Sequence, residues 1–112
     1  MNWNDTEQLI RQRVPKGTDV NSSRSKHRVV TGVDKLGFTV RIGQTTSIQI
    51  PWTMLRECFT ALISATGYDG GFFRARFPKQ AKAHPCHVHT VGQMFVTAGL
   101  ATERGRSYFL RK

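Results

Sequence analysis

Apolar and polar residues alternate between residues 28 and 50, and this pattern predicts three β-strands. A period of two places successive side chains on opposite faces of a sheet. The alternating apolar positions are Val29, Thr31 and Val33, then Phe38, Val40 and Ile42, then Ile48 and Ile50. Turn-forming residues at 34–37 and 43–46 separate the three runs. We therefore expect an antiparallel meander with one buried face, whose other face shows Thr39, Arg41, Ser47 and Gln49.

Two segments have apolar residues at helical spacing. Residues 53–66 predict a helix with Thr53 as its N-cap and Gly67 just beyond its end. Residues 85–98 predict a second helix that begins at a proline and stops before Gly99. Both segments repeat apolar residues every three or four positions, as an amphipathic helix does. A short helix at 5–13 is also expected.

The remaining segments complete an α+β fold class. Residues 72–77 alternate phenylalanine or alanine with arginine, which predicts a fourth strand. Residues 100–110 contain a Gly/Arg turn between two short apolar runs and predict a C-terminal β-hairpin. Residues 1–27 are expected to form a flexible N-terminal arm, and residues 28–112 a single α+β domain.

Charge narrows the class of partner. The 112 residues hold 17 Lys plus Arg against 7 Asp plus Glu, a formal net charge of +10, so a polyanion such as nucleic acid is the expected partner. The length excludes large enzyme architectures. Cys58 and Cys86 form no CxxC pair and are interpreted as free thiols of a reducing compartment. With no leader and no apolar run long enough to cross a membrane, a cytoplasmic protein is expected.

The charge excess is concentrated after Gly70, which points to the C-terminal half as the binding region. The cations there that we assign to nucleic-acid binding are Arg74, Arg76, Lys79, Lys82, Arg104, Arg106 and Arg111. The helix at 85–98 adds an uncharged polar stripe with His89, Thr90 and Gln93. Base edges in a major groove are read by such hydrogen-bonding side chains while cations hold phosphates. We therefore expect duplex DNA, in preference to RNA, as the partner of this helix and the hairpin.

The run from His89 to Leu110 resembles the recognition helix and wing of winged helix-turn-helix proteins. By this resemblance Thr90 and Gln93 would approach bases, while Arg104 and Arg106 would lie along the DNA backbone or in the minor groove. The resemblance implies a winged-helix-like fold and a regulatory or accessory role. The chain departs from the pattern between residues 68 and 85, where the family has a full second helix.

Histidines at 84–89 raise two chemical alternatives. His84, Cys86, His87 and His89 are potential metal ligands, but no second ligand pair follows, so we expect no metal and no cofactor. His87 and His89 also resemble the histidine-hydrophobe-histidine motif of rolling-circle and transposon nucleases, in which a tyrosine such as Tyr108 would attack. On a helix the two histidines diverge by about 200° and cannot share an ion. A non-enzymatic protein is therefore expected, with the nuclease as an alternative.

Four alternatives stay open. The exposed sheet face around Thr39, Arg41 and Gln49 resembles that of sheet-based DNA-binding domains. Phe72 or Tyr108 would stack on the bases of a single strand. A small basic protein of the mobile-element type would instead bind an acidic protein partner, and a homodimer is compatible with the sequence.

Overall fold

The helices and strands follow one another in an α+β arrangement. The computed structural model describes residues 2–21 and 27–111. Its elements are α1 (Trp3–Arg13), β1 (Arg28–Val33), β2 (Gly37–Ile42), β3 (Thr46–Pro51), α2 (Trp52–Leu62), α3 (Gly70–Arg76), α4 (Pro78–Ala83), α5 (His87–Thr97), β4 (Ala101–Arg104) and β5 (Ser107–Leu110). Strands β1, β2 and β3 form an antiparallel meander, and β4 pairs with β5 as a hairpin. The predicted fold class, meander and terminal hairpin are confirmed.

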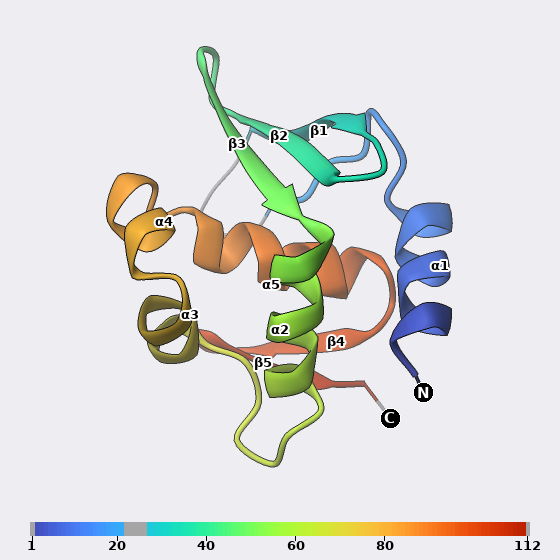
Figure 1. Cartoon of the computed structure of the whole chain (residues 1–112), viewed down its shortest axis with the longest axis vertical. Helices are drawn as coiled ribbons and strands as arrows, with labels where there is room; N and C mark the ends of the chain where they lie inside the picture. The colour runs from blue at the N-terminus through green and yellow to red at the C-terminus, as the bar shows by residue number, and fades with distance from the viewer. Residues whose placement is uncertain (1, 22–26, 112) are drawn as a thin grey trace.

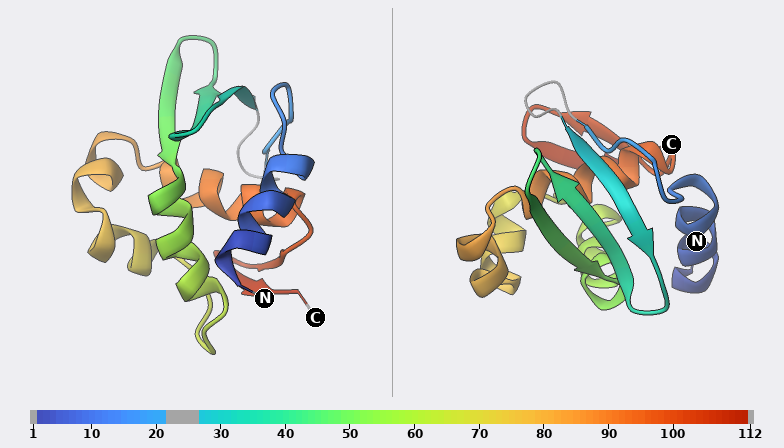
Figure 2. Two further views of the ribbon diagram at one scale, coloured as in Figure 1. Left: turned by 45° about the vertical axis from the view of Figure 1, so that its right-hand side comes forward. Right: turned by 90° about the horizontal axis from the view of Figure 1, so that it is seen from above.

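Helix α5 occupies the centre of the molecule (Figure 1). The three-stranded sheet covers one side of it and the hairpin covers the opposite side, while α1 lies near one end and α3 and α4 near the other (Figures 1 and 2). Val91, Met94 and Phe95 are completely buried. Arg13 at the end of α1 donates from Nη1 to the carbonyl oxygen of Ala98 at 2.8 Å, which satisfies an orphan carbonyl after α5. A helix enclosed in this way is the core of the domain rather than a surface element.

The meander buries the predicted face of β2 and β3, but in β1 the residues that face the core differ from those predicted. Val30 pairs with Val40, and both are buried. A register shift between Val30 and Gly32 marks a β-bulge, which changes the face on which the following residues lie. The prediction that placed Val29 on the buried face is therefore wrong, because Val30 faces inward and residue 28 shares its side. Arg28 therefore lies in the interior, with 3% of its surface exposed.

The segment predicted as a flexible arm contributes to the core. Ile10, Val14 and Val20 are all completely buried. The Val20 amide donates to the carbonyl oxygen of Arg28, and the Val30 amide donates to that of Thr18, each at 2.9 Å. The stretch before β1 thus extends the edge of the sheet, and for residues 3–20 the arm assignment is corrected. Residues 22–26 of the predicted arm lie outside the described residues.

Residues 70–76 form helix α3, so the fourth strand predicted at 72–77 is wrong. Asp69 caps the helix, its Oδ1 accepting from the Phe72 amide at 2.9 Å. Phe73 is the one buried residue of this short helix, so the alternation of phenylalanine and arginine does not come from a strand.

Helices α2 and α5 are both shorter than predicted. α2 begins at Trp52 with Pro51 at its N-cap, and the chain from 63 to 67 turns back to pair Tyr68 with Tyr108.

Candidate nucleic-acid interface

A cleft forms where the start of α3, the start of α5 and the turn of the hairpin meet. It is lined by Asp69, Gly70, Gly71, Arg74, Pro85, Val88, His89, Arg106 and Ser107. Three residues that we assigned to binding from the sequence, Arg74, His89 and Arg106, thus come together from separate segments. Two guanidinium groups in one concave site make it suited to an anion with several oxygens.

Glycines lie beside both arginines of the cleft. A Cβ added to Gly70 would lie 2.6 Å from Nη1 of Arg74, so the guanidinium lies directly over Gly70. Arg106 follows Gly105, whose φ of 62° is the left-handed conformation that the hairpin turn requires. Both arginines remain exposed to solvent. Their guanidinium groups are therefore accessible to a ligand.

A buried polar network lies behind His89. Nδ1 of His89 lies 2.9 Å from the Tyr108 hydroxyl. Gln93 donates from Nε2 to Oε1 of Glu103 at 3.1 Å and to the Tyr108 hydroxyl at 3.3 Å. Tyr108 is completely buried, and burial raises its pKa to about 12. The network fixes the imidazole from the interior and keeps the phenol neutral.

The polar stripe of α5 packs inward, which corrects its predicted role. Thr90 is 0% exposed and Gln93 is 5% exposed, so neither side chain reaches a base. The Thr90 hydroxyl donates to the carbonyl oxygen of Cys86 at 2.8 Å, while Gln93 contacts Tyr108 and Glu103. The hairpin covers this uncharged stripe of α5. Of the three stripe residues, only His89 lines the cleft.

The other predicted cations are exposed but do not line the cleft. Lys79 and Lys82 lie on α4, the short helix beside α3. Arg76 pairs with Glu57 at 2.9 Å, and this hydrogen bond raises its pKa. Arg104 lies over the ring of Phe109, 5.7 Å from its centroid, and Arg111 follows the last strand. Arg76 and Arg104 each lie two residues from an arginine of the cleft, and Lys79 and Lys82 lie on the helix between α3 and α5.

The geometry of the two histidines does not match the nuclease motif. The two nitrogens of His87 contact backbone oxygens, Nδ1 that of His84 at 3.0 Å and Nε2 that of Gln49 at 3.1 Å. His89 instead contacts Tyr108, so the imidazoles diverge as a helix requires. Within residues 2–21 and 27–111 no three His, Cys, Asp or Glu side chains are grouped to hold a metal ion. The buried Tyr108 hydroxyl is not placed to attack a strand.

The outer face of the meander is the alternative surface that the sequence raised. Arg41, Ser47 and Gln49 are exposed there as expected, and the Thr39 hydroxyl donates to Oε1 of Gln49 at 3.1 Å. Arg41 is the one cation among the four side chains predicted for this face. This surface therefore offers less positive charge than the cleft and α4.

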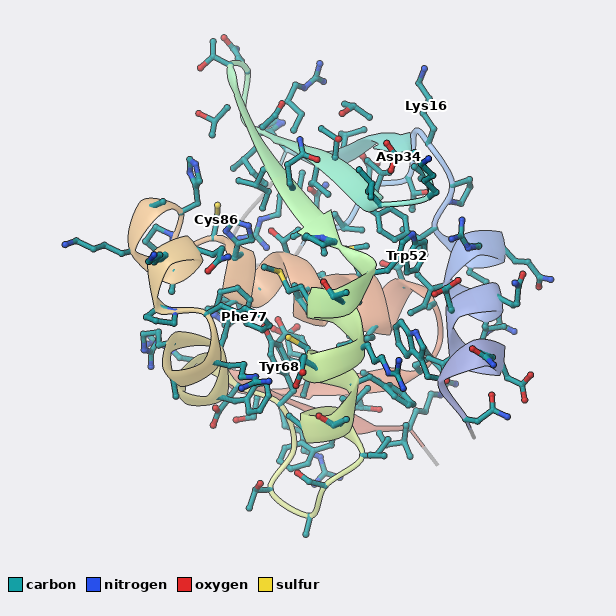
Figure 3. All side chains as sticks on the ribbon, in the orientation of Figure 1. Lys16, Asp34, Trp52, Tyr68, Phe77 and Cys86 are labelled. Atoms are coloured by element: carbon teal, nitrogen blue, oxygen red, sulfur yellow. The ribbon has the colours of Figure 1, made fainter. Side chains whose placement is uncertain are left out.

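Arg28 is a buried cation that sequence reasoning missed. Its Nε and Nη1 meet no hydrogen-bond acceptor among the described residues. Burial lowers the pKa of the guanidinium, and electrostatic interaction with the neighbouring Cys86 and Tyr108 offsets only part of this shift. Cys86 lies at the start of α5 beside α4 (Figure 3), and burial raises its thiol pKa. A buried charge with unsatisfied donors is destabilising.

We expect Arg28→Met to stabilise the protein. The methionine keeps an unbranched apolar stem and removes two nitrogens that have no hydrogen-bond acceptor in the described part of the chain, so the free energy of unfolding should rise by about 1–2 kcal/mol. Urea denaturation at pH 7 measures this difference. Arg41→Met, an exposed arginine on the neighbouring strand, is the matched control and should change stability by less than about 0.5 kcal/mol. A destabilised Arg28→Met protein would show that the guanidinium has a partner in solution.

Comparison of the chain with family models, with curated proteins and with solved structures gave no match. Among the described residues, no helix combines the length and apolar character that crossing a bilayer requires. The assignment of the cleft therefore depends on its own residues and their geometry.

Proposed function

We propose that the protein is a non-enzymatic nucleic-acid-binding protein that contacts phosphates through the cleft and the neighbouring cations of α4. The observation that supports this most directly is the meeting of Arg74 and Arg106 in one concave site. Guanidinium groups bind phosphate oxygens through paired, charge-assisted hydrogen bonds. The net charge of +10 adds long-range attraction to a polyanion.

The burial of Thr90 and Gln93 changes the kind of binding that we propose. Without an exposed polar face on α5, this helix supplies no direct base contacts, and phosphate contacts carry no sequence information. The argument that favoured duplex DNA over RNA depended on that face. Binding is therefore proposed to be weakly sequence-dependent and strongly salt-dependent.

The double variant Arg74→Ala/Arg106→Ala tests this proposal. If each arginine neutralises one phosphate, the slope of log affinity against log salt should flatten by about two for duplex DNA, and affinity in 0.1 M salt should fall about tenfold or more. Fluorescence anisotropy with a labelled duplex at four salt concentrations measures both quantities.

A charge-matched control separates a site from a general charge effect. Lys35→Ala/Arg41→Ala also removes two exposed cations, but from the turn and outer face of the meander. It should leave the salt slope close to that of the unmodified protein. An equal loss in both double variants would contradict the assignment of the cleft, and an unmodified protein that binds neither DNA nor RNA would contradict the function.

A further inference from the structure

We propose that the cleft binds one ribonucleotide unit of an RNA strand, with the phosphate on Arg74 and Arg106 and the ribose 2′-hydroxyl on Asp69. This inference rests on the proposed function, because it assumes that the two arginines contact a nucleic-acid phosphate. It adds a reason for the strand to be RNA. That reason is the carboxylate in an otherwise cationic cleft.

Asp69 has one oxygen engaged and one available. Its Oδ1 accepts from the Phe72 amide at 2.9 Å, which holds the carboxylate at the edge of the cleft. Its Oδ2 has no hydrogen-bond donor among residues 2–21 and 27–111. The side chain is half-buried, and Gly71 beside it has no side chain to cover the carboxylate.

The arginines and the aspartate do not neutralise one another. The ion pairs of the described residues are Arg11 with Glu7 and Arg76 with Glu57, and neither includes a residue of the cleft. Arg74 and Arg106 therefore keep their hydrogen-bonding capacity for a ligand. Asp69 keeps an acceptor that only a hydrogen-bond donor can use.

RNA supplies the complementary pair of groups. An internal phosphodiester carries one negative charge, which matches the single net positive charge that two arginines and one aspartate contribute to the cleft. The Asp69 carboxylate repels a nearby phosphate in DNA and RNA alike, and a hydrogen-bond donor beside the phosphate offsets that repulsion. The ribose 2′-hydroxyl is the donor that lies next to the phosphate in RNA and is missing from DNA. With Asp69 in the cleft, the phosphate-binding site should therefore distinguish ribose from deoxyribose.

Three single-stranded oligonucleotides of equal length test the inference. They are oligouridine, oligodeoxyuridine and 2′-O-methyl oligouridine, which share the base and differ at the 2′ position. The unmodified protein should bind the RNA about tenfold more tightly than the DNA, since a hydrogen bond to a charged group contributes about that factor. The 2′-O-methyl strand should bind like the DNA, because the methyl group removes the donor. Anisotropy titrations at fixed salt give all three affinities.

Asp69→Asn is the variant that isolates the carboxylate. Asparagine is as good an N-cap as aspartate, so α3 should keep its start. Loss of the negative charge should tighten DNA binding, and the RNA-to-DNA affinity ratio should fall to about two. Asp19→Asn, an exposed aspartate at the edge of the meander, is the matched control and should leave the ratio unchanged.

The outcomes distinguish this inference from the proposed function. Equal, salt-dependent binding of the three strands by the unmodified protein would overturn the role of Asp69 and leave phosphate binding intact. Absence of binding to any strand would overturn both. If Asp69→Asn fails to fold, the comparison of RNA with its 2′-O-methyl form still decides the question.

Discussion

Gly92→Ala should destabilise the protein by about 3 kcal/mol, one of the largest effects of any single substitution that we expect. A Cβ at position 92 would lie 2.2 Å from Cζ of Tyr108 and 2.7 Å from its Cδ2. The phenol ring therefore packs directly on the backbone of α5. Tyr108 is held by pairing of its strand and by the network with Gln93, so it has no space into which to move. Urea denaturation at pH 7 measures the loss.

Two further variants attribute this loss to the contact with Tyr108. Gly71→Ala places alanine in another helix, where the new Cβ would meet only the Asp69 carboxylate at 3.2 Å. Helix propensity favours alanine over glycine, so this control should be neutral or stabilising. In a Tyr108→Ala background the cost of Gly92→Ala should shrink to below about 1 kcal/mol. An undiminished cost in that background would mean that the strain arises elsewhere.

The sheet and the hairpin were predictable because their patterns are local. Alternation from Phe38 to Ile50 requires only that one face of a strand be buried, and the structure buries Phe38, Val40, Ile48 and Ile50. The turn at Gly105 is also a local signal. The β-bulge after Val30 has no such signal, so the inward position of Arg28 could not be derived.

The polarity of α5 was misleading because its partners are distant in sequence. Thr90 and Gln93 lie on a stripe without charge, which suits a major groove and a buried polar network equally well. The choice depends on Tyr108 and Glu103, which fold back along α5 as a hairpin. The order of the elements after His89 shows that a hairpin follows a helix but does not show which face it covers. The winged-helix resemblance of the hairpin stays a prediction.

The candidate site was partly predictable from charge. Arg74, His89 and Arg106 belong to the segment where cations outnumber acids, and the structure brings these three together. Asp69 was missed because it resembles the turn residue that a helix cap also requires. The alternation of phenylalanine and arginine around Arg74 matched a strand, and only the capping contact to Phe72 shows that a helix begins there. The cleft therefore depends on a helix start that periodicity alone does not reveal.

Alkaline pH should unfold the protein between about pH 10 and 12, as a result of three buried acidic groups. Burial raises the pKa of Tyr108 to about 12 and that of the Cys58 thiol to about 12, and it raises the pKa of Tyr68 as well. Tyr68 lies in the interior near α2 and α3 (Figure 3), and its hydroxyl donates to the carbonyl oxygen of Val88 at 2.8 Å. All three groups are completely buried as neutral side chains.

The sign of this effect follows from proton linkage. A group whose pKa is higher in the folded state keeps its proton there after it has lost it in the unfolded chain. Its stabilisation is therefore complete below its ordinary pKa, about 9 for cysteine and 10 for tyrosine, and is lost as pH rises toward 12. Tyr108 alone should remove about 2–3 kcal/mol over this range, and Cys58 about 4 kcal/mol. A domain of this size has about 5–15 kcal/mol of stability to lose.

Absorbance of the phenolate near 295 nm makes the unfolding directly visible. Tyr68 and Tyr108 are the two tyrosines of the chain, so no exposed tyrosine contributes to the signal. Up to about pH 10.5 the folded protein should show little phenolate, and both tyrosines should then titrate together, in step with the loss of far-ultraviolet circular dichroism. Tyr108→Phe should make stability fall less steeply above pH 10, because one of the linked protons is gone. A phenolate signal that rises smoothly around pH 10 while the circular dichroism stays unchanged would show that a tyrosine is accessible in the folded state, and the polar network behind the cleft would then have to be open to solvent.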